Sequence, residues 1–253
     1  MAKHARSNKS KKIILLNFLR FISIIILLVS IIYITKWLID RNENKKLEER
    51  VLEAIIIDNK ENELNADVKY EIDFKKLKQI NNQVVGYLKV NGTNIEYPVV
   101  RAEDNNYYLK RNLDKKYNSG GWIFADYKNK FDGTDKNIVI YGHNMKDNSM
   151  FGSLKNILNE EWYNNEENHL ISFITEKEEQ KYKVFSIYKI KNEDYYINTE
   201  FKNNYEFINF TNKLKERSIK NFNIDVLEED SILTLSTCAN NNKYRIVLHA
   251  KKI

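Results

Sequence analysis

The sequence predicts a mostly β domain, a barrel or a sandwich, that follows one membrane-spanning helix. About eight short runs of alternating apolar and polar residues follow residue 80, with turn residues at most joints, as in antiparallel sheets. Few helical stretches separate these runs, which argues against a parallel α/β sheet. One long apolar run lies near the start of the 253-residue chain, and it predicts the membrane helix.

The predicted membrane anchor is residues 13–39, the most hydrophobic stretch of the chain. Its uninterrupted apolar part, Phe21–Thr35, would extend roughly 22 Å as a helix, which is less than the hydrocarbon thickness of a bilayer. The span therefore includes residues on both sides, and Arg20 and Lys36 can reach the headgroups. No A-x-A-like cleavage site follows, so we expect the anchor to be retained.

The net charge of +6 is explained by the first twenty residues, which contain six cations and no acid. The rest of the chain has equal numbers of acidic and basic residues, which excludes a nucleic-acid-binding surface. Cations before a membrane helix predict a cytoplasmic N-terminus. Residues 1–12 are therefore predicted to be a basic cytoplasmic tail, and everything after residue 39 is predicted to lie on the extracellular side of the membrane.

Residues 40–69 are predicted to form an extracellular helical stalk. Apolar residues recur at helical spacing between Asp40 and Asn59, and a charged, weakly patterned joint follows. The remaining residues, 70–253, are predicted to be the folded β domain, and Tyr70–Ile80 is predicted to be a short helix at its start.

The predicted strands of this domain follow from period-two alternation of apolar residues. An Asn91-Gly92-Thr93-Asn94 turn joins the first two strands as a hairpin. A helical insertion, Glu200–Arg217, precedes the last two strands, because Phe207, Phe210 and Leu214 share helical spacing. The predicted strands are Val84–Val90, Ile95–Val100, Trp122–Ala125, Asn137–Tyr141, Leu170–Thr175, Tyr182–Ile190 and two within Ser231–Ala250.

The chain has one cysteine, Cys238, which excludes an intramolecular disulfide, a CxxC pair and a cysteine-based zinc site. Cys238 ends an alternating run, an Asn-rich turn follows, and the next run carries Arg245. This pattern predicts a β-hairpin that sets a thiol beside a fixed positive charge. A structural interpretation remains open for each residue. Cys238 could be a thiol packed in the core, and Arg245 could be an exposed strand cation with an ion-pair partner.

His143 is the histidine best placed to assist a thiol, because it directly follows a predicted strand in NIVIYGHNM. Gly142 is predicted to allow a sharp turn that exposes the imidazole. A free thiol is only a few per cent thiolate at neutral pH, a nearby cation favours the anion, and a histidine can protonate a leaving amine. Arg245 could donate to the oxyanion of an attacked carbonyl. The order of histidine before cysteine excludes the papain arrangement.

IVIYGHNM, TLSTC and the arginine of YRIVLHA together resemble the sortases, membrane-anchored cysteine transpeptidases of Gram-positive bacteria. The segments INNQVVGYLKVNGTNIEYPVVR, DNNYYL, SGGWIFAD and GHNMKDNSMFGSL resemble class B members. The helical insertion before the final strands is similar to that class as well. The resemblance extends from about Phe74 to Ile253.

The resemblance implies an eight-stranded sortase-type β-barrel and a specific reaction. Cys238 would attack the Thr–Gly or Thr–Asn bond of a sorting signal of the NPxTN or xPxTG type on a surface protein. An amine of peptidoglycan or of its lipid-linked precursor would then resolve the thioacyl enzyme. His143 matches the general acid/base and Arg245 the stabilising arginine, and no metal or other cofactor is implied. The substrate-binding residues implied by the resemblance are Asn105, Leu109, Ser236, Tyr196 and Ile197.

Two other functions remain open from the sequence. The same site could serve a cell-surface cysteine peptidase whose main outcome is hydrolysis, because water and amine compete for the thioacyl intermediate. A membrane-tethered scaffold domain would instead keep Cys238 as a packed thiol that resists alkylation. Product analysis with and without an added amine distinguishes the peptidase from the transpeptidase. Thiol alkylation distinguishes the scaffold domain from both enzymes.

Overall fold

A computed structural model of the chain consists of two compact units, Met1–Glu43 and Asn44–Ile253. The residues that the structure describes are 2–58, 69–191, 193–239 and 243–253. The helices are α1 (Ala2–Leu52), α2 (Phe74–Ile80), η1 (Tyr107–Leu109), η2 (Gly152–Leu158), α3 (Glu160–Tyr163), η3 (Glu166–His169), η4 (Tyr195–Ile197) and α4 (Asn204–Glu216). The strands are β1 (Ile55–Asp58), β2 (Lys69–Ile72), β3 (Val84–Val90), β4 (Ile95–Val100), β5 (Phe124–Ala125), β6 (Asn137–Gly142), β7 (Leu170–Ile174), β8 (Glu179–Lys191), β9 (Ile232–Ala239) and β10 (Tyr244–Lys252).

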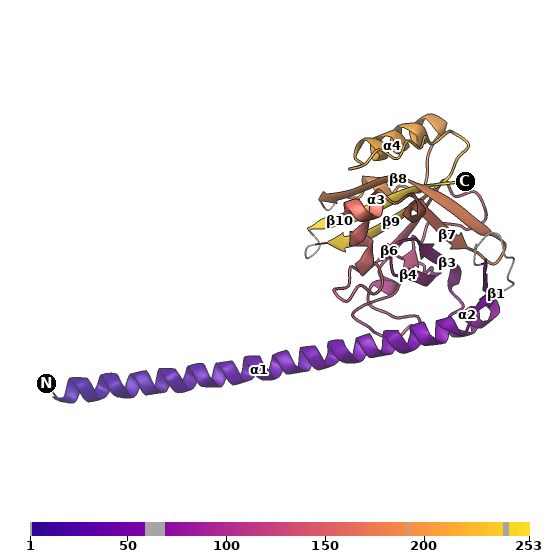
Figure 1. The fold of residues 1–253 in the computed structure, drawn as a ribbon. Coiled ribbons are helices and arrows are strands. Elements are labelled where there is room, and N and C mark those ends of the chain that lie inside the picture. The colour runs from indigo at the N-terminus through magenta and orange to yellow at the C-terminus, as the bar shows by residue number, and fades with distance from the viewer. Residues whose placement is uncertain (1, 59–68, 192, 240–242) are drawn as a thin grey trace. The chain divides into compact units, whose positions relative to one another are not determined.

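Eight strands close into a barrel in the order β10-β8-β7-β3-β4-β5-β6-β9, which confirms the predicted fold class (Figure 1). Six of the neighbouring pairs are antiparallel, whereas β4–β5 and β6–β9 are parallel. Closure leaves the barrel with no unpaired edge strand. The parallel β6–β9 pair also brings the ends of two strands that are distant in sequence to the same end of the barrel.

The predicted strands agree closely with the observed ones. β3 and β4 have the predicted bounds, and their hairpin turns at Gly92, which has φ of +69°. β8 begins at Glu179, three residues before its predicted start, because it continues through polar residues that pair with β7. Alternation of apolar residues does not mark such a polar extension, since it carries no buried face.

The prediction of one helix over Tyr70–Ile80 is wrong at its start. β2 occupies the first residues and pairs antiparallel with β1, and α2 begins only at Phe74. The Asp73 carboxylate accepts a hydrogen bond from the backbone N–H of Lys76 at 3.0 Å and so caps the helix. The predicted helix over residues 40–59 likewise ends at Leu52, because β1 follows it.

β9 has one face toward the barrel core and one toward an outer layer. Leu233 and Leu235 pack in the barrel core, whereas Ile232 belongs to a second cluster outside the barrel. The predicted insertion is confirmed as α4, which lies beside β8 in Figure 1. Its Phe207 and Leu214 are buried in this second cluster. Side chains on the outer face of β8, β9 and β10 are therefore covered over part of the length of these strands.

α1 is the one helix among the described residues that is long and apolar enough to cross a membrane. From Ile13 onward it contains a segment with a mean hydropathy of 2.6, and none of that segment is buried by other parts of the chain. The helix is a candidate membrane span by its length and composition. The predicted bounds of the tail, anchor, stalk and catalytic domain remain predictions.

His249 is fully buried on the outer face of β10, between Phe185, Tyr188 and Tyr196. Burial lowers its pKa to about 3. Above pH 6.5 the ring is neutral in the folded and the unfolded chain. Between pH 6.5 and 3 the unfolded chain binds a proton that the fold excludes, so stability is lost as the pH falls through this window.

We expect this histidine to contribute a slope of about 1.4 kcal/mol per pH unit to the free energy of unfolding below pH 6.5. Thermal unfolding followed by circular dichroism at pH 7.5, 6 and 5 measures the effect. His249→Gln is expected to be less stable at pH 7.5 but to lose less further stability on acidification. Equal pH dependence in both proteins would contradict this account of His249.

Candidate active site

Three segments meet at one end of the barrel and carry the predicted catalytic residues. In the β9–β10 pair the backbone of Cys238 lies directly opposite Arg245. In the parallel β6–β9 pair Gly142 lies opposite Thr237, so His143 follows β6 at the level of Cys238. The register of two strand pairs thus places these three positions together, although β6 and β9 are far apart in the sequence.

A pocket of about 370 Å³ opens at this end of the barrel. Seven of the eight predicted site residues line it, and the side chain of the eighth, Cys238, lies outside the described residues. The loops after β4 and β8 line it, together with residues at the ends of β5, β6, β9 and β10. The lining residues are Asn105, Leu109, Phe124, Tyr141, Gly142, His143, Glu193, Asp194, Tyr196, Ile197, Ser236, Thr237 and Arg245.

The imidazole of His143 is partly buried and is held by the backbone. Its Nε2 lies 2.7 Å from the carbonyl oxygen of Leu109, which accepts the hydrogen bond. Gly121 allows this approach, because it has φ of +59° and a Cβ there would lie 2.5 Å from the Tyr108 oxygen and 3.0 Å from Cδ2 of His143. The glycine thus lets the Tyr108–Leu109 backbone and the imidazole ring pack closely.

The expectation that Gly142 provides a sharp turn is wrong. Gly142 is the last residue of β6, and it is absent from the glycines with positive φ. A Cβ at this position would lie 2.6 Å from Cγ of Phe151, which is fully buried. Glycine is therefore required here for close packing of a ring against the strand, and the exposure of His143 comes from the end of the strand.

Arg245 extends into the pocket from the start of β10. Its side chain is partly buried, and Nη1 donates to the backbone oxygen of Tyr244 at 3.3 Å. A guanidinium presents five N–H donors in a planar fork, which suits it to bind an oxygen ligand in two places. The pocket therefore holds a general acid/base candidate and a fixed cation.

The predicted substrate-binding residues lie on two sides of the pocket. On one side, the hydroxyls of Tyr196 and Ser236 are 2.8 Å apart, and Ile197 lies beside them. On the other side, Asn105 lies near Leu109. Tyr196 and Ile197 come from η4, which precedes the α4 insertion, and Ser236 comes from β9, so this side of the pocket joins the loop to the barrel.

Sequence reasoning missed the carboxylate that orients the Asn105 side of the pocket. Asp126 is only 3% exposed, and its Oδ2 accepts hydrogen bonds of 2.8 Å from Asn105 Nδ2 and from the Tyr141 hydroxyl. Burial and the Asp126 charge raise the pKa of Tyr141, which keeps its proton on the phenol. Alternation along β6 places Tyr141 on the same face as His143, and this signal could have identified Tyr141 as a residue of the pocket.

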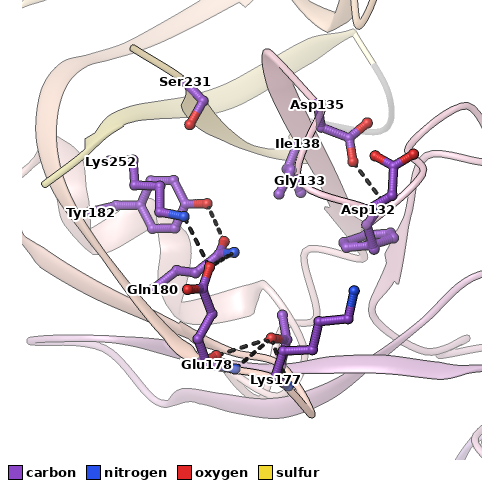
Figure 2. Close-up of a pocket in the computed structure, with 12 residues that line it drawn as sticks. Asp132, Gly133, Asp135, Ile138, Lys177, Glu178, Gln180, Tyr182, Ser231 and Lys252 are labelled. Carbon is purple, nitrogen blue, oxygen red and sulfur yellow. Dashed lines mark hydrogen bonds and ion pairs between the residues drawn. The ribbon is translucent and has the colours of Figure 1, made fainter. Parts of the chain in front are cut away.

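A second pocket lies at the opposite end of the same strands (Figure 2). Its polar side chains pair with one another: Glu178 accepts from Gln180 at 2.7 Å and from Lys252 at 3.1 Å, and Gln180 accepts from Tyr182 at 2.7 Å. It contains no histidine or cysteine among its lining residues. The chemistry predicted from the sequence therefore belongs to the pocket at the His143 end.

A family model described as the sortase domain matches residues 88–253. Sortase B of Staphylococcus aureus (strain NCTC 8325 / PS 47) is 34% identical over 183 residues, covering 71% of this chain and 74% of that protein. The crystal structure of sortase B from B. anthracis in complex with AAEK1 is similar with a TM-score of 0.72 at 36% identity, covering 85% of this chain and 99% of that chain. A Staphylococcus aureus sortase B–substrate complex has a TM-score of 0.67 at 34% identity, covering 72% of this chain and 84% of that chain.

The matched family region includes all eight predicted site residues and nearly the whole barrel. The relatives named above are all class B sortases, and the similarity holds in sequence and in structure. The chain therefore belongs to the sortase family as a class B member, a cysteine transpeptidase.

Proposed function

We propose that this sortase cleaves a C-terminal sorting signal of the NPxTN or xPxTG type after threonine and transfers the surface protein to a peptidoglycan amine. The observation that carries the proposal is the meeting of His143 and Arg245 with the backbone of Cys238 at one pocket. Directly opposite residues on antiparallel strands have Cβ atoms roughly 5 Å apart. The backbone of Cys238 lies directly opposite that of Arg245, and both residues are proposed to act on the same carbonyl.

The first half-reaction forms a thioester. The thiolate of Cys238 attacks the threonine carbonyl carbon, and the C–N bond to the next residue breaks. His143 gives its proton to the departing amine, which leaves as the C-terminal fragment. The guanidinium of Arg245 donates to the oxygen that becomes negative in the tetrahedral intermediate.

The second half-reaction releases the enzyme. An amine of peptidoglycan or of its lipid-linked precursor attacks the thioester, loses a proton to His143, and displaces the Cys238 thiolate as the new amide forms. Since the Leu109 carbonyl accepts a hydrogen bond from Nε2 of His143, that nitrogen carries a proton, and Nδ1 is the ring nitrogen left to exchange one. A pocket-lining residue thus also sets the tautomer of the histidine.

The sorting signal is proposed to bind along the pocket between its two sides. The Staphylococcus aureus relative is described as a sortase B–substrate complex, which supports a sorting-signal substrate for this chain. The proposed contacts are Asn105, Leu109, Ser236, Tyr196 and Ile197, all of which line the pocket. Leu109 and Ile197 offer apolar contact, and the other three offer hydrogen-bonding groups.

The domain is proposed to act outside the cell while held to the membrane. Supporting this, five cations and no acid precede the apolar span that begins at Ile13, which predicts a cytoplasmic N-terminus. The proposed organisation is a cytoplasmic tail (1–12), a membrane anchor (13–39), a stalk (40–69) and a catalytic domain (70–253). The bilayer and the cell wall would then be the immediate partners of the protein.

Peptide cleavage tests the proposal. Full-length protein in detergent is incubated with peptides bearing NPxTN, xPxTG or LPxTG motifs, with and without an amine that mimics the peptidoglycan cross-bridge, and products are identified by mass spectrometry. We expect cleavage after threonine in an NPxTN or xPxTG peptide and an amide product when amine is present. Release of free acid only, even at high amine concentration, would instead support a peptidase. Cleavage of LPxTG peptides alone would contradict the proposed signal.

A further inference from the structure

A chain of buried polar side chains crosses the outer face of the barrel and ends at the loop that lines the active-site pocket. The Tyr188 hydroxyl lies 2.8 Å from Nε2 of His249, and Nδ1 of His249 lies 2.9 Å from the Thr234 hydroxyl. Thr234 donates to Oδ1 of Asn137 at 2.7 Å, and Nδ2 of Asn137 donates to the Asn198 carbonyl at 2.8 Å. The side chains of Thr234, Asn137 and His249 are fully buried.

The direction of each hydrogen bond in this series of side chains follows from the amide of Asn137. Asn137 Nδ2 donates to a carbonyl, so its Oδ1 is the acceptor for the Thr234 hydroxyl. The Thr234 oxygen can then accept only from a protonated Nδ1 of His249. A neutral His249 with its proton on Nδ1 leaves Nε2 to accept from Tyr188. Every donor in the chain meets an acceptor, and this matters because a half-satisfied buried network is costly.

The last hydrogen bond of this series, at the Asn198 carbonyl, reaches the loop on the proposed substrate side of the pocket. Asn198 directly follows η4, and Tyr196 and Ile197 of η4 line the pocket. Among the described residues, the hydrogen bond from Asn137 to the Asn198 carbonyl and the one between Tyr196 and Ser236 join this loop to the barrel. Asn137 begins β6, the strand that His143 follows, and Thr234 lies on the strand of Cys238. These hydrogen bonds thus connect the loop to β6 and β9, the strands of the catalytic residues His143 and Cys238.

We propose that Thr234, Asn137 and His249 are positioning residues that hold the Tyr196–Asn198 loop in the geometry that binds the sorting signal. This inference rests on the proposed function, in which Tyr196 and Ile197 contact the peptide. Thr234 is the central link, because its hydroxyl both donates and accepts. Without that hydroxyl, Asn137 Oδ1 loses its donor, and the side chain that donates to the loop is no longer held in its rotamer.

Kinetics of Thr234→Val and Thr234→Ser, measured on the full chain in detergent, test the proposal. Valine has the same shape without the hydroxyl, whereas serine keeps it. We expect Thr234→Val to raise KM for the cleaved peptide about five- to tenfold with kcat within about twofold, in line with the loss of one or two hydrogen bonds. Thr234→Ser is expected to restore a KM near that of the unmodified protein.

Ser186→Ala is the matched control, because it removes a buried hydroxyl from the same outer face with no link to the loop. Ser186 is fully buried on β8 and donates to the Leu214 carbonyl of α4 at 2.6 Å. We expect this variant to lose thermal stability while its KM is unchanged. An unchanged KM in Thr234→Val, or an equal rise of KM in Ser186→Ala, would overturn the proposal.

Amide hydrogen exchange separates a failure of this inference from a failure of the proposed function. Thr234→Val is expected to speed exchange at residues 193–198, whereas Ser186→Ala is not. This readout requires no turnover. Faster exchange confined to that loop, in protein that cleaves none of the sorting peptides, would support the positioning of the loop and count against the proposed function. Unchanged exchange there would overturn the positioning of the loop whatever the activity.

Discussion

Cys238→Ala is expected to abolish cleavage of the sorting peptide while the barrel stays folded. Cys238 is the only thiol in the chain, so no other side chain can form the thioester. Removing a catalytic nucleophile lowers kcat by roughly 10⁴- to 10⁶-fold. The substitution deletes one sulfur atom from a strand whose backbone pairing with Arg245 is unaffected by the side chain. Mass spectrometry of the products and circular dichroism of the protein measure the two outcomes.

Two comparisons make this prediction specific. The unmodified protein should form an acyl adduct on Cys238 that can be captured by intact-mass measurement when amine is withheld, and the alanine variant should form none. Alkylation of Cys238 at neutral pH should inactivate the unmodified protein in step with modification. Cleavage that persists in the alanine variant would exclude the thioester route.

Arg245→Lys is expected to lower kcat/KM by about 10²-fold or more. The loss of one oxyanion donor costs this much in other acyl-transfer sites. Lysine keeps the charge but cannot reproduce the planar fork of the guanidinium. Arg245 is partly buried at the start of β10 and lines the pocket in which the peptide is proposed to bind. Steady-state kinetics with the cleaved peptide measure the effect.

Arg50→Lys provides a matched control for the loss of a guanidinium. Arg50 pairs with Asp114 through Nη1 at 3.0 and 2.9 Å, away from the pocket-lining residues. This variant is expected to keep its kcat/KM within about twofold, because exposed ion pairs contribute little. A near-normal rate in Arg245→Lys would assign Arg245 a structural role only.

The strands were predictable because their signal is local. Each carries its own alternation of apolar residues, and turn residues such as Gly92 separate them. The error at Tyr70–Ile80 has a non-local cause. β2 exists because β1 pairs with it, and the sequence of β2 alone does not reveal a partner strand. The polar start of β8 was missed for the same reason, since its pairing with β7 defines it.

The pocket was predictable only where a motif marked its residues. TLSTC and IVIYGHNM carry the resemblance, and seven of the residues chosen with its help line one pocket. Asp126 carries no such mark, because its role depends on two side chains, Asn105 and Tyr141, that approach it from different segments. The chain of hydrogen bonds from Tyr188 to Asn198 escaped prediction for a similar reason, since five separate segments contribute to it.

The order of the strands in the barrel has a consequence for when this protein becomes reactive. β10 is the last strand in the sequence, yet it lies between β8 and β9 and closes the barrel. Until it is in place, β9 lacks one neighbour and Arg245 has no position opposite Cys238. If the N-terminus stays in the cytoplasm, as proposed above, β10 is the last strand of the barrel to cross the membrane, and the active site is incomplete throughout translocation. Its thiol would meet the fixed guanidinium only after the whole barrel had been delivered, which protects against premature acylation.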